Sequence, residues 1–548
     1  MTFRKIVAPL LAALFVLAAL LCFISYQPVR RAHAEWRANR NAEAIATSQK
    51  WLSFPLWRGQ HRQILAAAYL TSSRPELAEP HVSSLKRRRP RLTILDWTEV
   101  ATRLFAAGRY AEYLDFDQAL GSTEAKAAVY RAAALVALGR FDEGQRALRL
   151  GGDASSLSRA VQKALDERRG GEYPYLFDRR GRPLARLQVP TRQLTAAEPS
   201  LVPLLEREAG SLTWEATLSK GGDLDPVDTT LDAEVQRAAA NALGSFRGAL
   251  VVLDPRTDEL LAVVSSRGSG KLENIAIETQ YEPGSVIKVL TGASAIENNI
   301  ELQKALPYKC TGDMIIDGRH FGDWLPEGHG ALDSLDAALA QSCNLFFADI
   351  GLRLGFKRLN RLMQAAGFDA VTDLDLVRPP LGRTIPPVFN NYETAYYAIG
   401  LEHQSITALH LSMLASMMAN RGMLRAPRLI RGRRSILGQE MAVSSARRSV
   451  RIMQASTAER LIQSMVAVTT HPEGTGRRAV VEGLPIALKT GTAGRREAGY
   501  HALIMAFAPV EAPRMAIGLI IENSGSAETY AAPIAGSFFA AMKSAGLL

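Results

Sequence analysis

Ser285 and Lys288 are the residues whose types and spacing most directly suggest catalysis. Ser285 follows a Pro-Gly turn at the predicted start of a helix, and a spacing of three residues puts both side chains on one helical face. A serine hydroxyl becomes a strong nucleophile when a base removes its proton. A lysine amine can be that base where burial or a nearby cation lowers its pKa. The pair therefore predicts nucleophilic catalysis, with backbone N–H groups at the helix start available to an oxyanion.

Two further polar clusters follow along the chain. Ser342-Cys343-Asn344 opens a helical stretch, and Lys489-Thr490-Gly491-Thr492 ends an apolar strand. Gly491 between two threonines lets a substrate backbone approach closely. Lys489 offers a positive charge to a carboxylate, and it would also be the nearby cation that lowers the pKa of Lys288. Each pattern is weak alone, because Ser83-Ser84-Leu85-Lys86 repeats the first spacing inside a basic run that indicates a solvated surface.

The elements that must position these clusters lie in residues 229–548. Apolar strands are predicted near both ends of this segment, with helices between them. The expected fold is α+β, an antiparallel sheet built from both ends of the segment and flanked by helices. The predicted strands are 249–253, 260–264, 484–488, 502–508 and 515–521, and the main predicted helices are 231–243, 286–297, 335–354 and 405–418.

Residues 34–169 are rich in Ala, Leu and Arg at helical spacing, which predicts an all-helical, repeat-like domain. Residues 104–110 and 135–141 each read as a helix end, a Gly turn and an aromatic residue that opens the next helix. Their offset of 31 residues is close to the period of tetratricopeptide-type hairpins. An ordinary helical bundle with Gly stops is the alternative. Residues 170–228 are predicted to be a linker with a small β element.

Residues 6–26 are predicted to be a transmembrane anchor, preceded by a cytoplasmic tail of residues 1–5. The apolar run from Ile6 to Ile24 is long enough to cross a bilayer as a helix. A cleavable signal peptide is the alternative, because Ala32-His33-Ala34 has the form of a cleavage site, although the run is longer than a usual signal core. Arginines just after the run favour the opposite orientation. Large downstream domains translocate largely regardless of such charges, so an extracytoplasmic C-terminal part is expected.

The 548-residue chain has a net charge of +11 and a pI near 9.6, which suits an anionic partner or a solvated basic surface. No zinc-finger spacing, P-loop or aromatic RNA-binding pattern accompanies the charge, so no nucleic acid is expected as a partner. Three cysteines make neither a disulfide scaffold nor a metal cluster, and no metal or cofactor is expected. Cys310 and Cys343 remain as either a disulfide or two buried thiols, and His329 is expected to be structural.

Taken in order, the three polar clusters resemble those of the penicillin-recognising serine acyltransferases, the penicillin-binding proteins and serine β-lactamases. Their surroundings are similar too. Tyr281-Glu282-Pro283-Gly284 precedes the serine, and Gly474-Thr475-Gly476 precedes the third cluster. Trp324, Gly328-His329-Gly330 and Ala338-Leu339-Ala340-Gln341 precede the second cluster, as they often do in penicillin-binding proteins. The resemblance covers about residues 229–548.

The resemblance implies a role for each cluster. Ser285 would be the acylated nucleophile, Lys288 its base, and Ser342 a proton relay towards the leaving amine. The backbone N–H groups of Ser285 and Thr492 would form the oxyanion hole. The substrate-binding residues implied by the family are Asn344, Lys489, Thr490, Gly491 and Thr492.

Within that family the chain resembles a monofunctional class B penicillin-binding protein. Residues 344–489 lack the Glu-x-x-Leu-Asn motif of class A β-lactamases, and the chain lacks the glycosyltransferase signature of bifunctional members. The implied function is a membrane-anchored serine D,D-transpeptidase that cross-links peptidoglycan stem peptides and is inhibited covalently by β-lactams. A non-enzymatic β-lactam or peptidoglycan sensor, or a scaffold, is the alternative.

One feature departs from class B members. Their Asp-Arg-x-Gly-x-x-Leu-Ala segment usually follows closely on the membrane helix, whereas residues 178–185, which have this pattern, come only after the helical region. Class B enzymes typically pair with a membrane glycan polymerase, so the inserted residues 34–169 become a candidate contact for that polymerase and for other cell-wall proteins.

Overall fold

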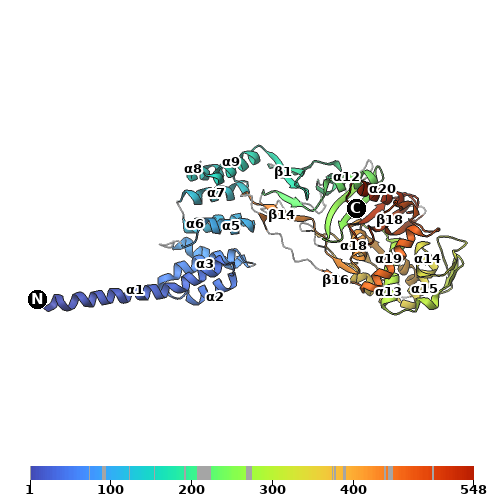
Figure 1. Ribbon diagram of the computed structural model, residues 1–548, viewed down its shortest axis with the longest axis horizontal. Helices are drawn as coiled ribbons and strands as arrows, with labels where there is room; N and C mark the ends of the chain where they lie inside the picture. The colour runs from blue at the N-terminus through green and yellow to red at the C-terminus, as the bar shows by residue number, and fades with distance from the viewer. Residues whose placement is uncertain are drawn as a thin grey trace.

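The chain is elongated in the computed structural model, with the N-terminal helix at one end and a mixed α/β body at the other (Figure 1). A stack of helices and a separate sheet lie between these two ends. The structure describes residues 2–72, 74–88, 94–121, 124–152, 155–189, 193–205, 224–266, 274–372, 374, 378–386, 390–436, 440–441, 449–495 and 499–548.

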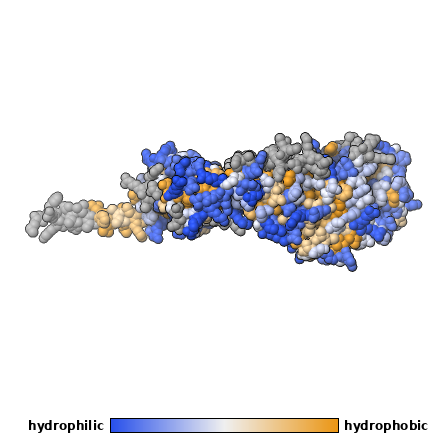
Figure 2. Space-filling model, turned by 90° about the horizontal axis from the view of Figure 1, so that it is seen from above, coloured by the Kyte–Doolittle hydropathy of each residue, from blue (hydrophilic) through white to orange (hydrophobic). Residues whose placement is uncertain are grey.

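Helix α1 (Thr2–Arg37) joins an exposed apolar segment to the helical stack without a break. Its segment Leu14–Arg37 is long and apolar enough to cross a bilayer. Figure 2 shows the apolar part as an orange stretch that leads into the mainly blue surface of the stack. In the second half of this segment, Val29, Ala32 and Trp36 are buried in the core of the stack. One helix therefore provides both the candidate membrane span and the first helix of the stack.

The stack is all-helical over the described part of residues 34–169, as predicted. After α1, its helices are α2 (Asn41–Trp51), α3 (Arg58–Leu70), α4 (Glu79–Arg87), α5 (Trp97–Ala106), α6 (Tyr110–Leu120), α7 (Ala125–Ala137), α8 (Phe141–Gly151) and α9 (Ser156–Arg169).

Three helix ends in the stack share one turn. A residue in the left-handed conformation is followed by an arginine whose N–H donates to the carbonyl five residues earlier, which satisfies a free carbonyl of the helix end. The sequence predicted two of these turns through their glycines and missed the first, where Asn39 takes the left-handed position. The bonds are Arg40 to Glu35 (2.9 Å), Arg109 to Leu104 (2.8 Å) and Arg140 to Leu135 (2.8 Å).

A six-stranded sheet follows the stack, in the order β15-β14-β4-β1-β2-β3. The hairpin expected near residues 175–185 is the antiparallel pair β1 and β2. The buried Asp178 carboxylate shapes its turn by accepting from the backbone N–H groups of Arg180 and Arg182, both at 2.8 Å. The strands are β1 (Glu172–Phe177), β2 (Pro183–Gln188), β3 (Gln193–Ala196), β4 (Val227–Thr229), β14 (Ile430–Arg434) and β15 (Glu440–Met441). Because β14 and β15 come from far along the chain, this sheet is larger than the small β element expected for residues 170–228.

A buried ion pair joins the stack to this sheet. Asp225, which leads into β4, accepts from Arg168 Nη2 at 3.0 Å and from the Tyr110 hydroxyl. The neighbouring Leu224 N–H donates to Ala137 O in α7 at 2.8 Å. Asp225 is fully buried and Arg168 nearly so, so the contact is shielded from solvent and its loss would leave a buried charge without its partner.

The C-terminal body is built on a five-stranded antiparallel sheet in the order β17-β18-β19-β5-β6, which confirms the predicted α+β fold. Strands from both ends of residues 229–548 form this sheet, as expected. The strands are β5 (Gly248–Asp254), β6 (Glu259–Ser266), β17 (Ala487–Arg495), β18 (Gly499–Ala508) and β19 (Met515–Ile521). The prediction of a strand at 484–488 was wrong in position, because β17 begins later and continues through the third polar cluster.

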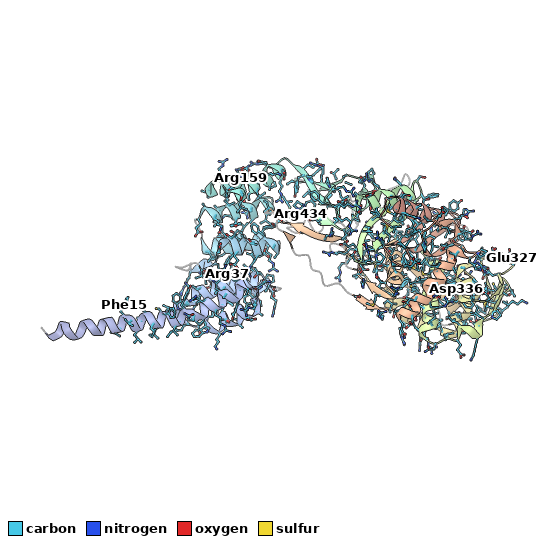
Figure 3. All side chains as sticks on the ribbon, in the orientation of Figure 1. Phe15, Arg37, Arg159, Glu327, Asp336 and Arg434 are labelled. Atoms are coloured by element: carbon cyan, nitrogen blue, oxygen red, sulfur yellow. The ribbon has the colours of Figure 1, made fainter. Side chains whose placement is uncertain are left out.

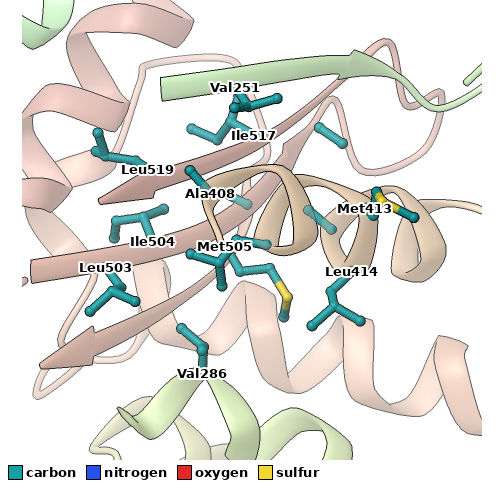
Figure 4. Close-up of a cluster of buried hydrophobic side chains, with 14 of the residues drawn as sticks. Val251, Val286, Ala408, Met413, Leu414, Leu503, Ile504, Met505, Ile517 and Leu519 are labelled. Carbon is teal, nitrogen blue, oxygen red and sulfur yellow. The ribbon is translucent and has the colours of Figure 1, made fainter. Parts of the chain in front are cut away.

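Helices cover the sheet. Apolar side chains of α18 (Ala408–Ala419) pack against β18 and β19 (Figure 4), and Gly518 permits this close approach, since a Cβ there would lie 2.2 Å from Ala408 O. The other helices of the body are α12 (Ala233–Leu243), α13 (Lys288–Glu297), α14 (Leu335–Ala340), α15 (Asn344–Leu354), α16 (Phe356–Ala365), α17 (Asn391–Ile399), α19 (Ala455–Thr470) and α20 (Ala531–Ser544).

Short strands complete the body away from the main sheet. They pair as β7 with β10, β8 with β9, β11 with β12 and β13 with β16. Their bounds are β7 (Tyr308–Cys310), β8 (Asp313–Ile316), β9 (Arg319–Gly322), β10 (Gly330–Leu332), β11 (Gly382–Thr384), β12 (Gln404–Ile406), β13 (Met423–Arg425) and β16 (Ser449–Arg451).

We expect Asp225→Ala to lower the free energy of unfolding by about 3–5 kcal/mol, because it removes one partner of a buried ion pair. Asp228→Ala is the matched control. Asp228 pairs at 2.8 Å with Arg434, whose side chain is 50% exposed, and an exposed pair contributes about 0–1 kcal/mol. Figure 3 labels Arg434 on the sheet side of the junction. Urea unfolding of the full chain measures both changes, and equal losses in the two variants would contradict the assigned role of Asp225.

Candidate active site

Ser285 lies in a short 3-10 turn, Gly284–Ile287, that leads directly into α13. Two glycines allow the backbone of this turn to lie directly against that of β17. Gly284 has a φ of +55°, and a Cβ there would lie 2.8 Å from Thr492 O. A Cβ on Gly491 would lie 2.8 Å from Pro283 O. The close contact of these two backbones holds the serine beside the third polar cluster, and Val286 fixes the turn from below by entering the core next to β18 (Figure 4).

Lys288 is completely buried at the first position of α13. Its Nζ donates to Ser342 O and to Asn344 Oδ1, both at 2.6 Å, and lies 3.3 Å from Ser342 Oγ. Burial lowers the pKa of the Lys288 amine to about 8, although the Asp323 carboxylate opposes that shift. A neutral amine has two hydrogens for its two short bonds, and its lone pair is then free to take a proton.

The second cluster occupies a break between α14 and α15, so the single helix that the sequence predicts over 335–354 is wrong at this point. Ser342 has a φ of +55°, a conformation in which a non-glycine residue is uncommon, and this turns its hydroxyl towards both lysines. Asp323 accepts from the N–H groups of Asn344 at 2.8 Å and Leu345 at 3.3 Å, which caps the start of α15. Sequence reasoning missed Asp323, because the capping residue lies about twenty positions upstream of the helix that it caps.

Lys489, in the interior of β17, is also completely buried. Its Nζ donates to Ser342 Oγ and to Thr490 O, both at 2.9 Å. Burial, and then the neighbouring Lys288 amine, lower the pKa of Lys489 well below its usual range. Both lysine amines therefore converge on one hydroxyl oxygen, that of Ser342.

The threonines of the third cluster have different surroundings. Thr490 is buried, and its hydroxyl shares a 2.7 Å hydrogen bond with that of Thr475 in the Gly-Thr-Gly segment. Thr475 in turn donates its N–H to Ala340 O at the end of α14, which ties this segment to the second cluster. Thr492 is exposed, and its hydroxyl accepts from Ala527 N at 3.1 Å. The cluster thus has one inward and one outward hydroxyl on the same strand.

The structure brings together the three polar clusters that the sequence singled out. The similar pattern at residues 83–86 lies elsewhere, in the helical stack. The Ser285 side chain is partly exposed, in the turn whose Gly284 lies against Thr492 of the third cluster. In α4, by contrast, Ser83 is bonded to Glu79 at 2.5 Å and Lys86 pairs with Asp115 at 2.9 Å on an exposed helix face. The pattern at residues 83–86 is a surface feature, as expected.

Four residues that could bind a metal ion lie close together at the second cluster, which itself contains one of them, Cys343. Ligand atoms of Cys310, Asp323, His329 and Cys343 are all within 4.8 Å of one another, and these are donors that Zn²⁺ accepts. Cys310 and Cys343 are not joined by a disulfide. A hydrogen bond from Cys343 lowers the pKa of the Cys310 thiol to about 5. The sequence predicts no metal cluster from its three cysteines, and among the described residues Glu393, Glu402 and His403 form a second group of possible ligands.

Comparison with known proteins identifies the class. The penicillin-binding protein transpeptidase domain matches residues 248–542 of this chain. The chain therefore belongs to the penicillin-binding protein transpeptidase family, as the three clusters predicted.

Two relatives give the resemblance more detail. Over 352 residues, which cover 56% of this chain and 68% of the relative, the chain is 30% identical to the peptidoglycan D,D-transpeptidase PbpA of Mycolicibacterium smegmatis. It is 28% identical over 366 residues to the peptidoglycan D,D-transpeptidase MrdA of Acinetobacter baumannii, covering 58% of this chain and 54% of the relative. The fold is similar to that of penicillin-binding protein A from M. tuberculosis in its ceftriaxone acyl-enzyme complex, with a TM-score of 0.59, 23% identity and coverage of 68% of this chain and 98% of that one.

Lys288→Arg should slow acylation by a β-lactam about 100- to 10,000-fold, because an arginine keeps its proton and cannot act as a base. Lys489→Arg should be affected less, since a positive charge survives there. In the unmodified protein the acylation rate should rise as pH increases through about 8, where the Lys288 amine loses its proton. Stopped-flow measurement of acylation at several pH values tests both points, after thermal unfolding has verified that each variant is folded. Equal impairment of the two variants would contradict this division of roles.

Proposed function

We propose that this chain cross-links peptidoglycan stem peptides through an acyl-enzyme on Ser285. The hydroxyl oxygen of Ser285 attacks the carbonyl carbon of the penultimate D-alanine, the bond to the terminal D-alanine breaks, and that residue leaves as a free amine. An acceptor amine then attacks the ester, forms the new amide bond and returns the proton to Ser285. The observation that carries this proposal is the convergence of two buried lysine amines on Ser342, with Lys288 only three residues after the partly exposed Ser285.

The two lysines have different roles because they carry different charges when substrate is bound. In the free enzyme each amine has a lowered pKa because both are buried, and the charge of Lys288 lowers the pKa of Lys489 further. A substrate carboxylate that binds beside Lys489, Thr490 and Thr492 raises the pKa of Lys489 again and places the proton there. Lys288 is then the neutral amine and takes the proton of Ser285. The substrate itself thus helps to prepare the base.

The remaining groups act on the leaving amine and the oxyanion. Ser342, bonded to both lysines, passes a proton from Lys288 to the departing amine. Asn344 holds the substrate amide, and the backbone N–H groups of Ser285 and Thr492 receive the developing negative charge. The close contact of Gly284 with Thr492 supports this last assignment, because it brings the two N–H-bearing residues together.

The rest of the chain positions this reaction. Residues 1–5 are a cytoplasmic tail, residues 6–26 anchor the chain in the cytoplasmic membrane, and residues 229–548 work on its outer side, where they cross-link the wall that determines cell shape. Residues 34–169 are tetratricopeptide-like hairpins, a reading supported by the three equivalent turns. They contact a membrane glycan polymerase or another cell-wall protein, and residues 170–228 connect them to the catalytic domain.

Ser285→Ala should abolish covalent labelling by fluorescent penicillin without unfolding the protein, and mass spectrometry of the unmodified protein should map the label to Ser285. Ser83→Ala is the matched control and should label normally. Purified protein should also release D-alanine from a pentapeptide donor and transfer the acyl group to an acceptor amine. Labelling that persists in Ser285→Ala would refute the nucleophile, whereas acylation without any turnover would favour a sensor over an enzyme.

A further inference from the structure

A tight turn between α2 and α3 exposes apolar side chains beside the candidate membrane span. All side chains from Ser53 to Leu56 are exposed, including those of Phe54 and Leu56 at 38% and 53%. Trp51 and Trp57 flank them and are partly buried. Apolar side chains exposed in such a cluster mark a contact surface.

This turn lies against α1 at the point where its apolar run ends. The indole N–H of Trp57 donates to Ser25 Oγ at 3.0 Å, and the rings of Trp57 and Tyr26 are 4.8 Å apart. Ile24, the last residue of the apolar run, is 57% exposed immediately before them. If α1 spans the bilayer, the turn therefore sits at the level of the lipid headgroups, the layer in which Trp and Tyr are enriched.

The turn is held in one shape. Arg58 donates from Nε to Leu52 O at 3.1 Å and from Nη2 to Ser53 O at 3.0 Å, which closes the turn from inside. The rings of Trp51 and Phe54 meet edge to face at 6.1 Å. A turn that is already ordered loses little conformational entropy when it enters a surface.

The charges near the turn suit an anionic surface. Residues 1–34 and 44–75 contain no aspartate or glutamate. Lys50, directly before Trp51, and Arg30, about one helical turn after Tyr26 in α1, are exposed, and neither makes an ion pair with the described residues. Basic side chains next to aromatic and aliphatic ones are the composition of segments that lie in the membrane interface.

We propose that residues 51–57 dock on the lipid bilayer, with Phe54 and Leu56 entering the interfacial layer of the leaflet from which the stack emerges. This inference rests on the membrane anchor of the proposed function. Since Val29 and Trp36 bury the same helix in the stack, a second attachment through the turn fixes the tilt of the stack on the membrane. The position of the catalytic body relative to the membrane is then set by the docked stack as well as by a single helix.

Fluorescence quenching in lipid vesicles tests this docking. The full chain carrying Cys22→Ala, with Cys310 and Cys343 buried, is labelled with an environment-sensitive fluorophore at one introduced cysteine and reconstituted with lipids that are brominated in their acyl chains. Phe15→Cys reports the span, Ser53→Cys the turn, and Leu150→Cys, in α8 on an exposed site far along the stack, the solvent. Figure 3 labels Phe15 within the exposed part of α1.

The label at Phe15 should be quenched most and that at Ser53 clearly, while the label at Leu150 should remain unquenched. Phe54→Asp together with Leu56→Asp should reduce quenching at Ser53 several-fold, whereas Leu150→Asp should not. Docking is refuted if the Ser53 label behaves like that at Leu150 while Phe15 is quenched, or if the two aspartates leave it unchanged. An unquenched Phe15 label would instead show that the anchor itself is wrong, and the docking with it.

Discussion

The burial of two lysine amines around one serine hydroxyl is the constraint on which the rest of the site depends. Lys288 and Lys489 lie 3.3 Å and 2.9 Å from Ser342 Oγ, and neither is exposed to water. Because both amines contact one oxygen, two positive charges here would be at most about 6 Å apart and would repel by at least on the order of 3 kcal/mol at an effective dielectric constant of 20, so a single shared charge is the favourable state. A neutral lysine amine is what activation of a serine requires, and burial lowers the pKa of both amines in that direction.

The surrounding fold serves this arrangement. Gly284 and Gly491 let the turn that carries Ser285 lie directly on β17, and the left-handed Ser342 turns its hydroxyl towards both lysines. Asp323 holds the start of α15 in place behind them. Farther away, Asp225 joins the body and its sheet to the helical stack, whose first helix is also the candidate membrane span.

Sequence patterns predicted the parts of this structure that depend on local composition. The apolar strands, the all-helical stack and the polar clusters are visible because burial and turn chemistry repeat at short spacing. The break at Ser342 could not be predicted, since it depends on contacts with Lys288 and Lys489 that are remote in sequence. The group around Asp323 and the pairing of β14 in the six-stranded sheet could not be predicted either, because contacts between residues far apart in the sequence leave no local signal.

The protonation state of the two buried lysines tests the account most directly. Protein labelled with ¹⁵N at the lysine side chains, with assignments from Lys288→Arg and Lys489→Arg, allows each Nζ to be titrated by NMR. We expect one of the two amines to be neutral near pH 8, far below the usual lysine pKa of about 10.4. If both Nζ resonances remained those of ammonium groups up to that usual value, the shared charge, and with it the proposed activation of Ser285, would be contradicted.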